Sequence, residues 1–176
     1  MRGLTEYKIA FSGLTLGVHE YDFEVTDKFF EHFDHEELHN VNVELVVELE
    51  KKSNMLQLWF GFQGTGSVFC DRCGKEMEIE LDGEEELIIK FGEGGFEEQT
   101  DDIVVIGPAE HEIDISHYVF EFIMLSVPLS HSHDIEDCDP EVIRTLEELS
   151  GKKEEEQQQE DPRWAALKKY KNDNNE

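Results

Sequence analysis

The residues of this sequence that are best suited to chemistry are cysteines and a histidine with metal-ligand spacing. Cys70 and Cys73 form a Cys-x-x-Cys pair that is followed at once by Gly74. Two thiolates at this spacing can bind one ion at about 2.3 Å, and a glycine permits the left-handed backbone that such a knuckle needs. His133 and Cys138 supply the missing half. The sequence therefore predicts one structural Zn²⁺ held by three cysteines and one histidine.

Other interpretations of these residues stay open. His131 is a second imidazole beside His133 and is an alternative ligand. The cysteines are also compatible with plain reduced thiols that bind no metal. A redox pair made of Cys70 and Cys73 is the third interpretation. Such pairs usually lie at the start of a helix in a βαβ unit, whereas both flanks here are β-prone and Asp71 would oppose a thiolate.

Sequence signatures of catalysis are missing from the chain. The remaining histidines are scattered, and the Ser-His pairs lack a nucleophile elbow or triad context. The glycine-rich segments 61–66 and 92–95 are not followed by the Gly-Lys-Ser/Thr of a phosphate-binding loop. We therefore expect no enzymatic activity, no catalytic residue and no small-molecule substrate.

A second candidate site lies in the C-terminal tail. Residues 161–170 predict a short amphipathic helix with aromatic and aliphatic side chains at three-residue spacing and basic residues around them. The candidate partner-binding residues are Arg163, Trp164, Leu167, Lys168 and Lys169. Such a helix can dock on its own acidic body, in a protein groove or on RNA.

Net charge limits the partners that the chain can have. With 43 acidic and 15 basic side chains, its formal charge is −28. So acidic a protein repels RNA and anionic lipid at long range, which disfavours direct RNA binding outside the tail and any membrane contact. The acidity serves either solubility or attraction to a basic protein. The N-terminus lacks the apolar core of a signal peptide, and no stretch approaches the apolar length of a membrane span, so we expect a cytoplasmic protein.

The elements that must position these residues are mostly strands. Period-two alternation and β-prone composition predict strands over residues 4–11, 18–25, 41–51, 55–69, 76–91 and 103–106. A tight turn at 52–54 joins two of them in a hairpin, and glycines 61, 64 and 66 suggest a bulge or a sharp bend in the second. Helices are expected over 28–33, from 114 or 116 to 125, and from 140 to 149.

This order of elements predicts an α+β fold, with an antiparallel β-rich sheet or partial barrel and a few helices that are mostly C-terminal. We expect one β-rich domain over residues 1–149, which carries the Cys-x-x-Cys knuckle. An acidic flexible linker over 150–160 and the short basic aromatic helix over 161–176 would follow it.

Three segments together resemble the YceD-type family of large ribosomal RNA subunit accumulation proteins. They are Cys70-Asp71-Arg72-Cys73, the run from Leu125 to His133, and Cys138-Asp139-Pro140. The ending from Asp161 to Lys169 is similar to the terminus of that family. In this comparison His133, five residues before Cys138, matches the family's histidine and His131 is extra. Gly74 is a departure, since a larger residue often follows the second cysteine.

The resemblance implies a bacterial or organellar protein needed for the synthesis, processing or stability of large-subunit ribosomal RNA, with no catalytic activity to carry over. We expect it to bind a ribosomal protein or a pre-ribosomal particle. The alternatives are a thiol redox protein that uses Cys70 and Cys73, and a direct RNA binder that uses the tail.

Overall fold

The structure, a computed structural model, describes residues 4–35, 37–92, 103–107 and 109–150. The chain divides into two units, one that ends at His133 and one that begins at Asp134. The predicted tail helix, with Arg163, Trp164, Leu167, Lys168 and Lys169, lies outside the described residues. None of the helices in the described ranges is long and apolar enough to cross a lipid bilayer.

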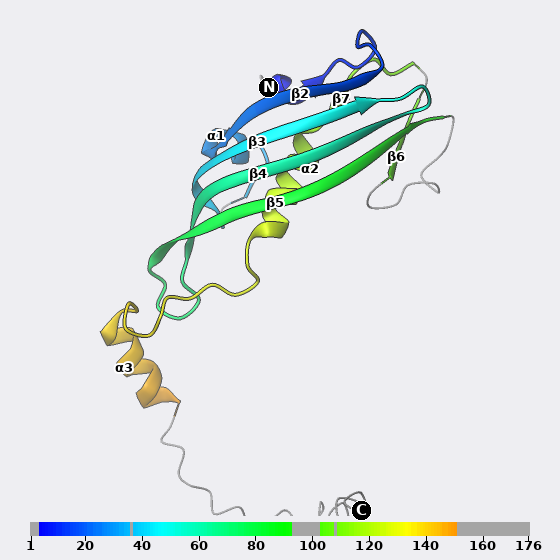
Figure 1. The fold of residues 1–176 in the computed structure, drawn as a ribbon. Helices are drawn as coiled ribbons and strands as arrows, with labels where there is room; N and C mark the ends of the chain where they lie inside the picture. The colour runs from blue at the N-terminus through cyan, green and yellow to red at the C-terminus, as the bar shows by residue number, and fades with distance from the viewer. Residues whose placement is uncertain (1–3, 36, 93–102, 108, 151–176) are drawn as a thin grey trace, which may run out of the picture. The chain divides into compact units, whose positions relative to one another are not determined.

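Within the described residues of the first unit, five strands form one sheet in the order β2-β3-β4-β5-β6 (Figure 1). The strands are β2 (Gly17–Thr26), β3 (His39–Lys51), β4 (Met55–Phe69), β5 (Glu76–Phe91) and β6 (Ile103–Ile106). Neighbouring strands are antiparallel except for β5 and β6, which are parallel. The sheet is open, so the prediction of an α+β fold with an antiparallel sheet is confirmed.

Alternation along the strands gives the sheet a core face and an open face. On β3, Val43, Leu45, Val47 and Leu49 are buried while the residues between them are exposed. Helix α2 (Ser116–Ser126) covers the core face, and in Figure 1 it crosses behind the sheet. Its Val119 and Ile123 are buried in the common core, and the ring of Phe122 lies 5.1 Å from that of Phe60 on β4. One helix and one sheet therefore share a single apolar core.

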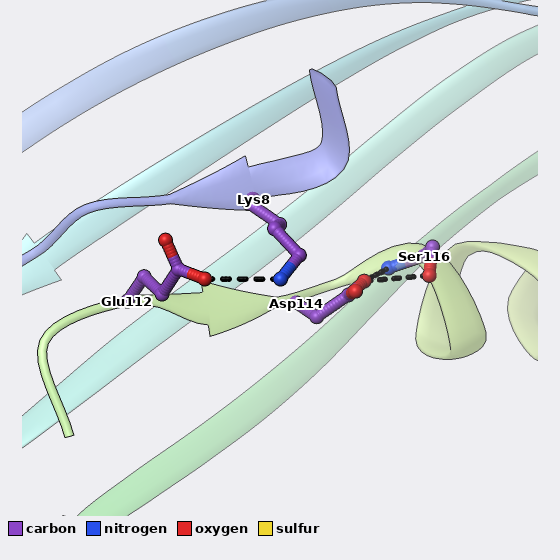
Figure 2. Close-up of polar contacts among 4 residues, drawn as sticks. All are labelled: Lys8, Glu112, Asp114 and Ser116. Carbon is purple, nitrogen blue, oxygen red and sulfur yellow. Dashed lines mark hydrogen bonds and ion pairs between the residues drawn. The ribbon is translucent and has the colours of Figure 1, made fainter. Parts of the chain in front are cut away.

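Short elements connect the N-terminus to the start of α2. A 3-10 turn η1 (Thr5–Tyr7) leads into β1 (Lys8–Ile9), which pairs with β7 (Ile113–Asp114). The predicted strand over residues 4–11 is therefore wrong in extent, because its first half is a turn that follows a left-handed Leu4. Figure 2 shows the ion pair between Lys8 and Glu112 beside this ribbon.

Helix α2 begins where the sequence predicts it. The Asp114 carboxylate accepts hydrogen bonds from the backbone N–H of Ser116, at 3.0 Å, and from its hydroxyl, at 2.6 Å (Figure 2). These bonds satisfy a donor that the first helical turn leaves open. The helix predicted over 28–33 is shorter than expected, because α1 spans only Asp27–Phe30.

The second unit contains α3 (Pro140–Leu149), whose bounds match the predicted helix. The side chain of Asp139 accepts a hydrogen bond from the backbone N–H of Glu141 at 2.9 Å, which makes it the N-cap. Pro140 occupies the first turn, where its missing N–H costs nothing.

The predicted irregularity of the hairpin lies on β3 and not on the glycine-rich strand. The register shifts between His39 and Asn42 of β3, and Asn40 has a positive φ of 52°. Just beyond this bulge Gly64 of β4 lies opposite Val43, and a Cβ on Gly64 would lie 2.6 Å from the Cα of Val43 and closer still to the carbonyl oxygen of Asn42. Gly64 therefore accommodates the bulge of its neighbour.

Lys51 fastens the N-terminal loop to the end of β3. Its Nζ donates hydrogen bonds to the carbonyl oxygens of Phe11 at 2.8 Å, Leu14 at 2.9 Å and Ser12 at 3.4 Å. Hydrogen bonds to charged groups contribute about 1.5–3 kcal/mol each when their partners are lost to solvent. We expect Lys51→Met to lower the free energy of unfolding in urea by about 2 kcal/mol, because it keeps the stem and removes the donor.

Lys28→Met is the control for this variant, because Lys28 is exposed on α1. Surface substitutions of that kind change stability by about 0.5 kcal/mol or less. Equal losses of unfolding free energy in the two variants would show that the hydrogen bonds of Lys51 to the N-terminal loop do not stabilise the fold.

Candidate metal centre

The first half of the centre is the tip of the hairpin that joins β4 to β5. Cys70 directly follows β4, and its backbone N–H donates to the carbonyl oxygen of Lys75 at 2.8 Å. The N–H of Gly74 returns to the carbonyl oxygen of Cys70 at 2.8 Å. Gly74 has a φ of 71°, the left-handed conformation that the sequence predicts for this glycine. The knuckle therefore turns both thiols of the Cys-x-x-Cys pair in one direction.

The second half is the loop that follows α2. Asp71 and His131 clasp this loop to the knuckle through two backbone-linked hydrogen bonds. The N–H of Asp71 donates to the carbonyl oxygen of His131 at 2.9 Å, and the N–H of His131 donates to the Asp71 carboxylate at 2.9 Å. Arg72 adds a bond from its Nη1 to the carbonyl oxygen of His133 at 2.9 Å. Residues about sixty positions apart in sequence are thus held side by side.

The clasp brings three predicted ligands of the first unit together. The sulfurs of Cys70 and Cys73 and a ring nitrogen of His133 all lie within 4.8 Å of one another. The Sγ of Cys73 is 3.4 Å from the Nδ1 of His133, and the backbone N–H of His133 donates to the Sγ of Cys70 at 3.4 Å. In a tetrahedral zinc site with bonds of about 2.0–2.3 Å, ligand atoms are roughly 3.5–3.8 Å apart. The spacing therefore suits one ion.

The electrostatics of the trio favour metal binding. Burial raises the pKa of the Cys70 thiol, but backbone N–H groups of Cys73, His133 and Arg72 and the Cys73 side chain stabilise its thiolate and bring its pKa from 9.0 to about 5. The pKa of His133 is raised, first by its hydrogen bond to the Cys73 side chain and then by that to Cys70. The thiolate is the form that binds zinc, and the ion takes the place of the proton on the imidazole.

The two candidate histidines differ in position. His133 lies beside both thiols, whereas the ring of His131 has its Nδ1 3.2 Å from the carbonyl oxygen of Pro128 and its Nε2 3.7 Å from the Asp71 carboxylate. Of the two histidines, His133 is the one whose ring nitrogen is grouped with the cysteine sulfurs. Cys138 belongs to the second unit, where its N–H donates to the carbonyl oxygen of Asp134 at 3.2 Å just before α3.

Asp71 has a role that the sequence did not indicate. Its carboxylate accepts a hydrogen bond from the backbone N–H of His131 and so helps to hold the loop that carries His133. Groups that orient metal ligands in this way typically account for 10–100-fold in metal affinity. We expect Asp71→Ala to weaken zinc binding by that factor in a competition titration against a chromophoric chelator. Glu78→Ala, a change at an exposed position of β5, is the control. Equal zinc affinities of the two variants would contradict a role of the Asp71–His131 hydrogen bonds in holding the site.

Comparison with known proteins gives one family. The family model described as "Large ribosomal RNA subunit accumulation protein YceD" matches residues 60–171, which is more than half of the chain. The matched range begins within β4 and includes Cys70, Cys73, His133 and Cys138. No curated protein and no solved structure matches the chain.

Proposed function

The chain belongs to the YceD family of large ribosomal RNA subunit accumulation proteins, and from this membership we propose that it supports the synthesis, processing or stability of large-subunit ribosomal RNA. It acts as a non-catalytic accessory protein in the cytoplasm. Its direct partner is a ribosomal protein or a pre-ribosomal particle. The family match carries this proposal, and the acidity of the chain favours a protein contact over direct contact with RNA.

We propose that Cys70, Cys73, His133 and Cys138 together hold one Zn²⁺. Three of them already converge in the first unit, and structural zinc sites almost always have four ligands. Cys138 follows His133 by five residues, a stretch that spans up to about 17 Å when extended, so the chain permits it to close the tetrahedron. With all four positions filled by protein there is no open position for a substrate, which makes the role structural.

The tail is the proposed contact for a specific partner. An acidic linker over 150–160 separates it from the rest of the chain, and Arg163, Trp164, Leu167, Lys168 and Lys169 form the contact surface. Aromatic and basic residues together suit a groove on a protein or ribonucleoprotein. Neutralising the three basic residues is expected to weaken binding to the particle.

The test is depletion of the protein in its own cell, with complementation by the full chain. We expect the ratio of large-subunit to small-subunit ribosomal RNA to fall on depletion and to be restored by the wild-type chain. The zinc-ligand variant Cys73→Ser should restore it poorly, because its fold is destabilised. An unchanged RNA ratio in depleted cells would end the proposal.

A thiol redox function is the second candidate, because the pKa of Cys70 is about 5. Low-pKa thiols are reactive when they are accessible, but Cys70 is only 3% exposed and lies between two strands. The zinc proposal predicts that Cys70 and Cys73 resist alkylation until a chelator is added. Rapid alkylation of both thiols in the metal-loaded chain would favour the redox function instead.

A further inference from the structure

The face of the sheet opposite α2 is open, and it is the face turned toward the viewer in Figure 1. Alternate residues of β2, β3, β4 and β5 form it, and apart from Ser67 at the end of β4 they are exposed or half-buried. The hydrophobic side chains on it include Val18, which is 62% exposed, and Val46, which is 39% exposed. Trp59 lies half-buried at its centre. Among the described residues of this unit, the helices are not on this side.

The register of the sheet aligns the acidic side chains of this face in columns. The columns are Glu20, Asp22 and Glu24 on β2, Glu44, Glu48 and Glu50 on β3, and Asp82, Glu84 and Glu86 on β5. The column on β4 between them is uncharged and consists of Gln57, Trp59, Gly61 and Gln63. Among the described residues, this side of the sheet carries two cations, Lys52 and Lys90. Lys52 forms an ion pair with Glu50 at 2.9 Å, and both lysines lie toward the turn between β3 and β4.

A trough follows the uncharged column. One hollow is lined by Trp59, Gly61 and Val46 with the carboxylates of Glu48 and Glu84 beside them. A second hollow continues it along Gly61 and Gln63 toward Glu44 and Asp82. Gly61 leaves the trough open at its centre, because a Cβ at this position would occupy space in which nothing lies within 4 Å. The trough thus has an uncharged floor, in which Trp59 and Gly61 lie between the amides of Gln57 and Gln63, and carboxylate walls.

The acidic columns also oppose one another. Glu20 lies directly across from Glu48, and Glu24 directly across from Glu44. Like charges in directly opposite positions destabilise a sheet. Cations in the trough beside Glu44 and Glu48 of β3 would relieve this repulsion, so charge complementarity defines the occupant of the face.

We propose that the trough along β4 binds an extended, lysine- and arginine-rich segment of a partner protein. Alternate residues along a strand are about 6.6–6.8 Å apart, and the same spacing separates alternate side chains of an extended segment lying along β4. Its cations then meet the carboxylates of β3 and β5, which lie about 4.8 Å to either side. The aliphatic stem of one cation packs on Trp59, whose ring face attracts the charge. The inference rests on the proposed function, because proteins that neutralise ribosomal RNA do so with lysine and arginine.

The test measures binding of a fluorescent peptide to the zinc-loaded full chain by anisotropy. The probe is an eight-residue peptide in which lysine alternates with valine and threonine. Its matched comparison has the same composition with the lysines in one block. We expect the alternating peptide to bind at least tenfold more tightly than the block peptide. Equal affinities would overturn the proposed extended register.

Two variants place the peptide on the trough. Gly61→Leu fills the floor and leaves the charge unchanged, and its Cβ would meet nothing within 4 Å. The pair Glu48→Gln and Glu86→Gln removes one carboxylate from each wall. Each is expected to raise the Kd at least tenfold. The control pair Glu31→Gln and Glu110→Gln removes the same charge from exposed positions off this face and should change the Kd less than twofold. Equal effects of the two pairs would mean diffuse attraction to an acidic protein and would overturn the site.

Two other occupants are separated by the same assay. A fluorescent single-stranded RNA that binds the chain as tightly as the peptide does, and loses that affinity in Gly61→Leu, would overturn the proposal in favour of RNA. A tenfold gain in affinity on neutralising Arg163, Lys168 and Lys169 would instead show that the chain's own tail fills the trough. If the peptide does not bind, the trough proposal fails while the effect of depletion on ribosomal RNA still stands. If the RNA ratio is unchanged on depletion, the proposed function fails while the peptide binding still stands. The two failures are therefore distinguishable.

Discussion

Removal of zinc with a strong chelator is expected to lower the melting temperature of the full chain by about 8–16 °C. A ligand that binds only the folded state stabilises it by about 4 kcal/mol at a thousand times its Kd. For a chain of this size each kcal/mol corresponds to about 2–4 °C. The reason lies in the knuckle, because without the ion two sulfurs and an imidazole that lie within 4.8 Å of one another lose their common partner. Differential scanning calorimetry with and without chelator measures the shift.

The two neighbouring histidines supply a matched pair for this prediction. His133→Asn should reproduce the effect of the chelator and abolish any further response to it, because its ring lies 3.4 Å from the Cys73 sulfur. His131→Asn keeps the backbone bonds to Asp71 and should melt like the wild-type chain. If both variants lose stability equally, or if the chelator leaves the wild-type melting temperature unchanged, the metal is not structural.

Gly64→Ala is expected to destabilise the chain by about 3 kcal/mol or more, which exceeds the usual cost of an extra methyl group in a core. The new Cβ would lie 2.6 Å from the Cα of Val43 and closer still to the carbonyl oxygen of Asn42, and backbone atoms cannot move aside as a flexible side chain can. The strands β3 and β4 must separate where Gly64 faces Val43, next to the bulge, which breaks the ladder there. Urea denaturation measures the loss as a lower midpoint.

Gly61→Ala, three residues along the same strand, is the control. Its Cβ would meet nothing within 4 Å, so only the loss of glycine's backbone freedom remains. Glycine within a strand is destabilising by roughly 0.5–1 kcal/mol relative to alanine, so this variant should be neutral or slightly more stable. Equal destabilisation of the two variants would show that the close approach at Gly64 is not what fixes the strand pair.

The sequence predicted the long strands well because their signal is local. Period-two alternation depends only on which side chains face the core, and it gave the bounds of β4, β5 and β6 as the structure has them. The glycines predict a bulge on the wrong strand, because the extra residue belongs to β3, where Asn40 has a positive φ, while Gly64 of β4 lies close to β3 beside it. A pairwise feature of this kind is not visible in either strand alone.

The candidate metal centre also has one part that the sequence predicts and another that it does not. The knuckle with its left-handed Gly74 follows from a motif of five residues, and it was predicted from them. The choice between His131 and His133 depends on the path of the loop, which Asp71 and Arg72 fix from about sixty residues away. No pattern in the sequence links these positions. Cys138 as the fourth ligand and the partner-binding tail stay predictions.

X-ray absorption at the zinc edge, on the full chain purified without chelator, tests the Cys3His centre most directly. We expect one zinc per chain, with three sulfur ligands at about 2.3 Å and one nitrogen at about 2.0–2.1 Å. In Cys138→Ser the sulfur count should fall to two and the metal should be held less tightly. A chain without zinc, or one whose zinc has only nitrogen and oxygen ligands, would contradict the proposed centre.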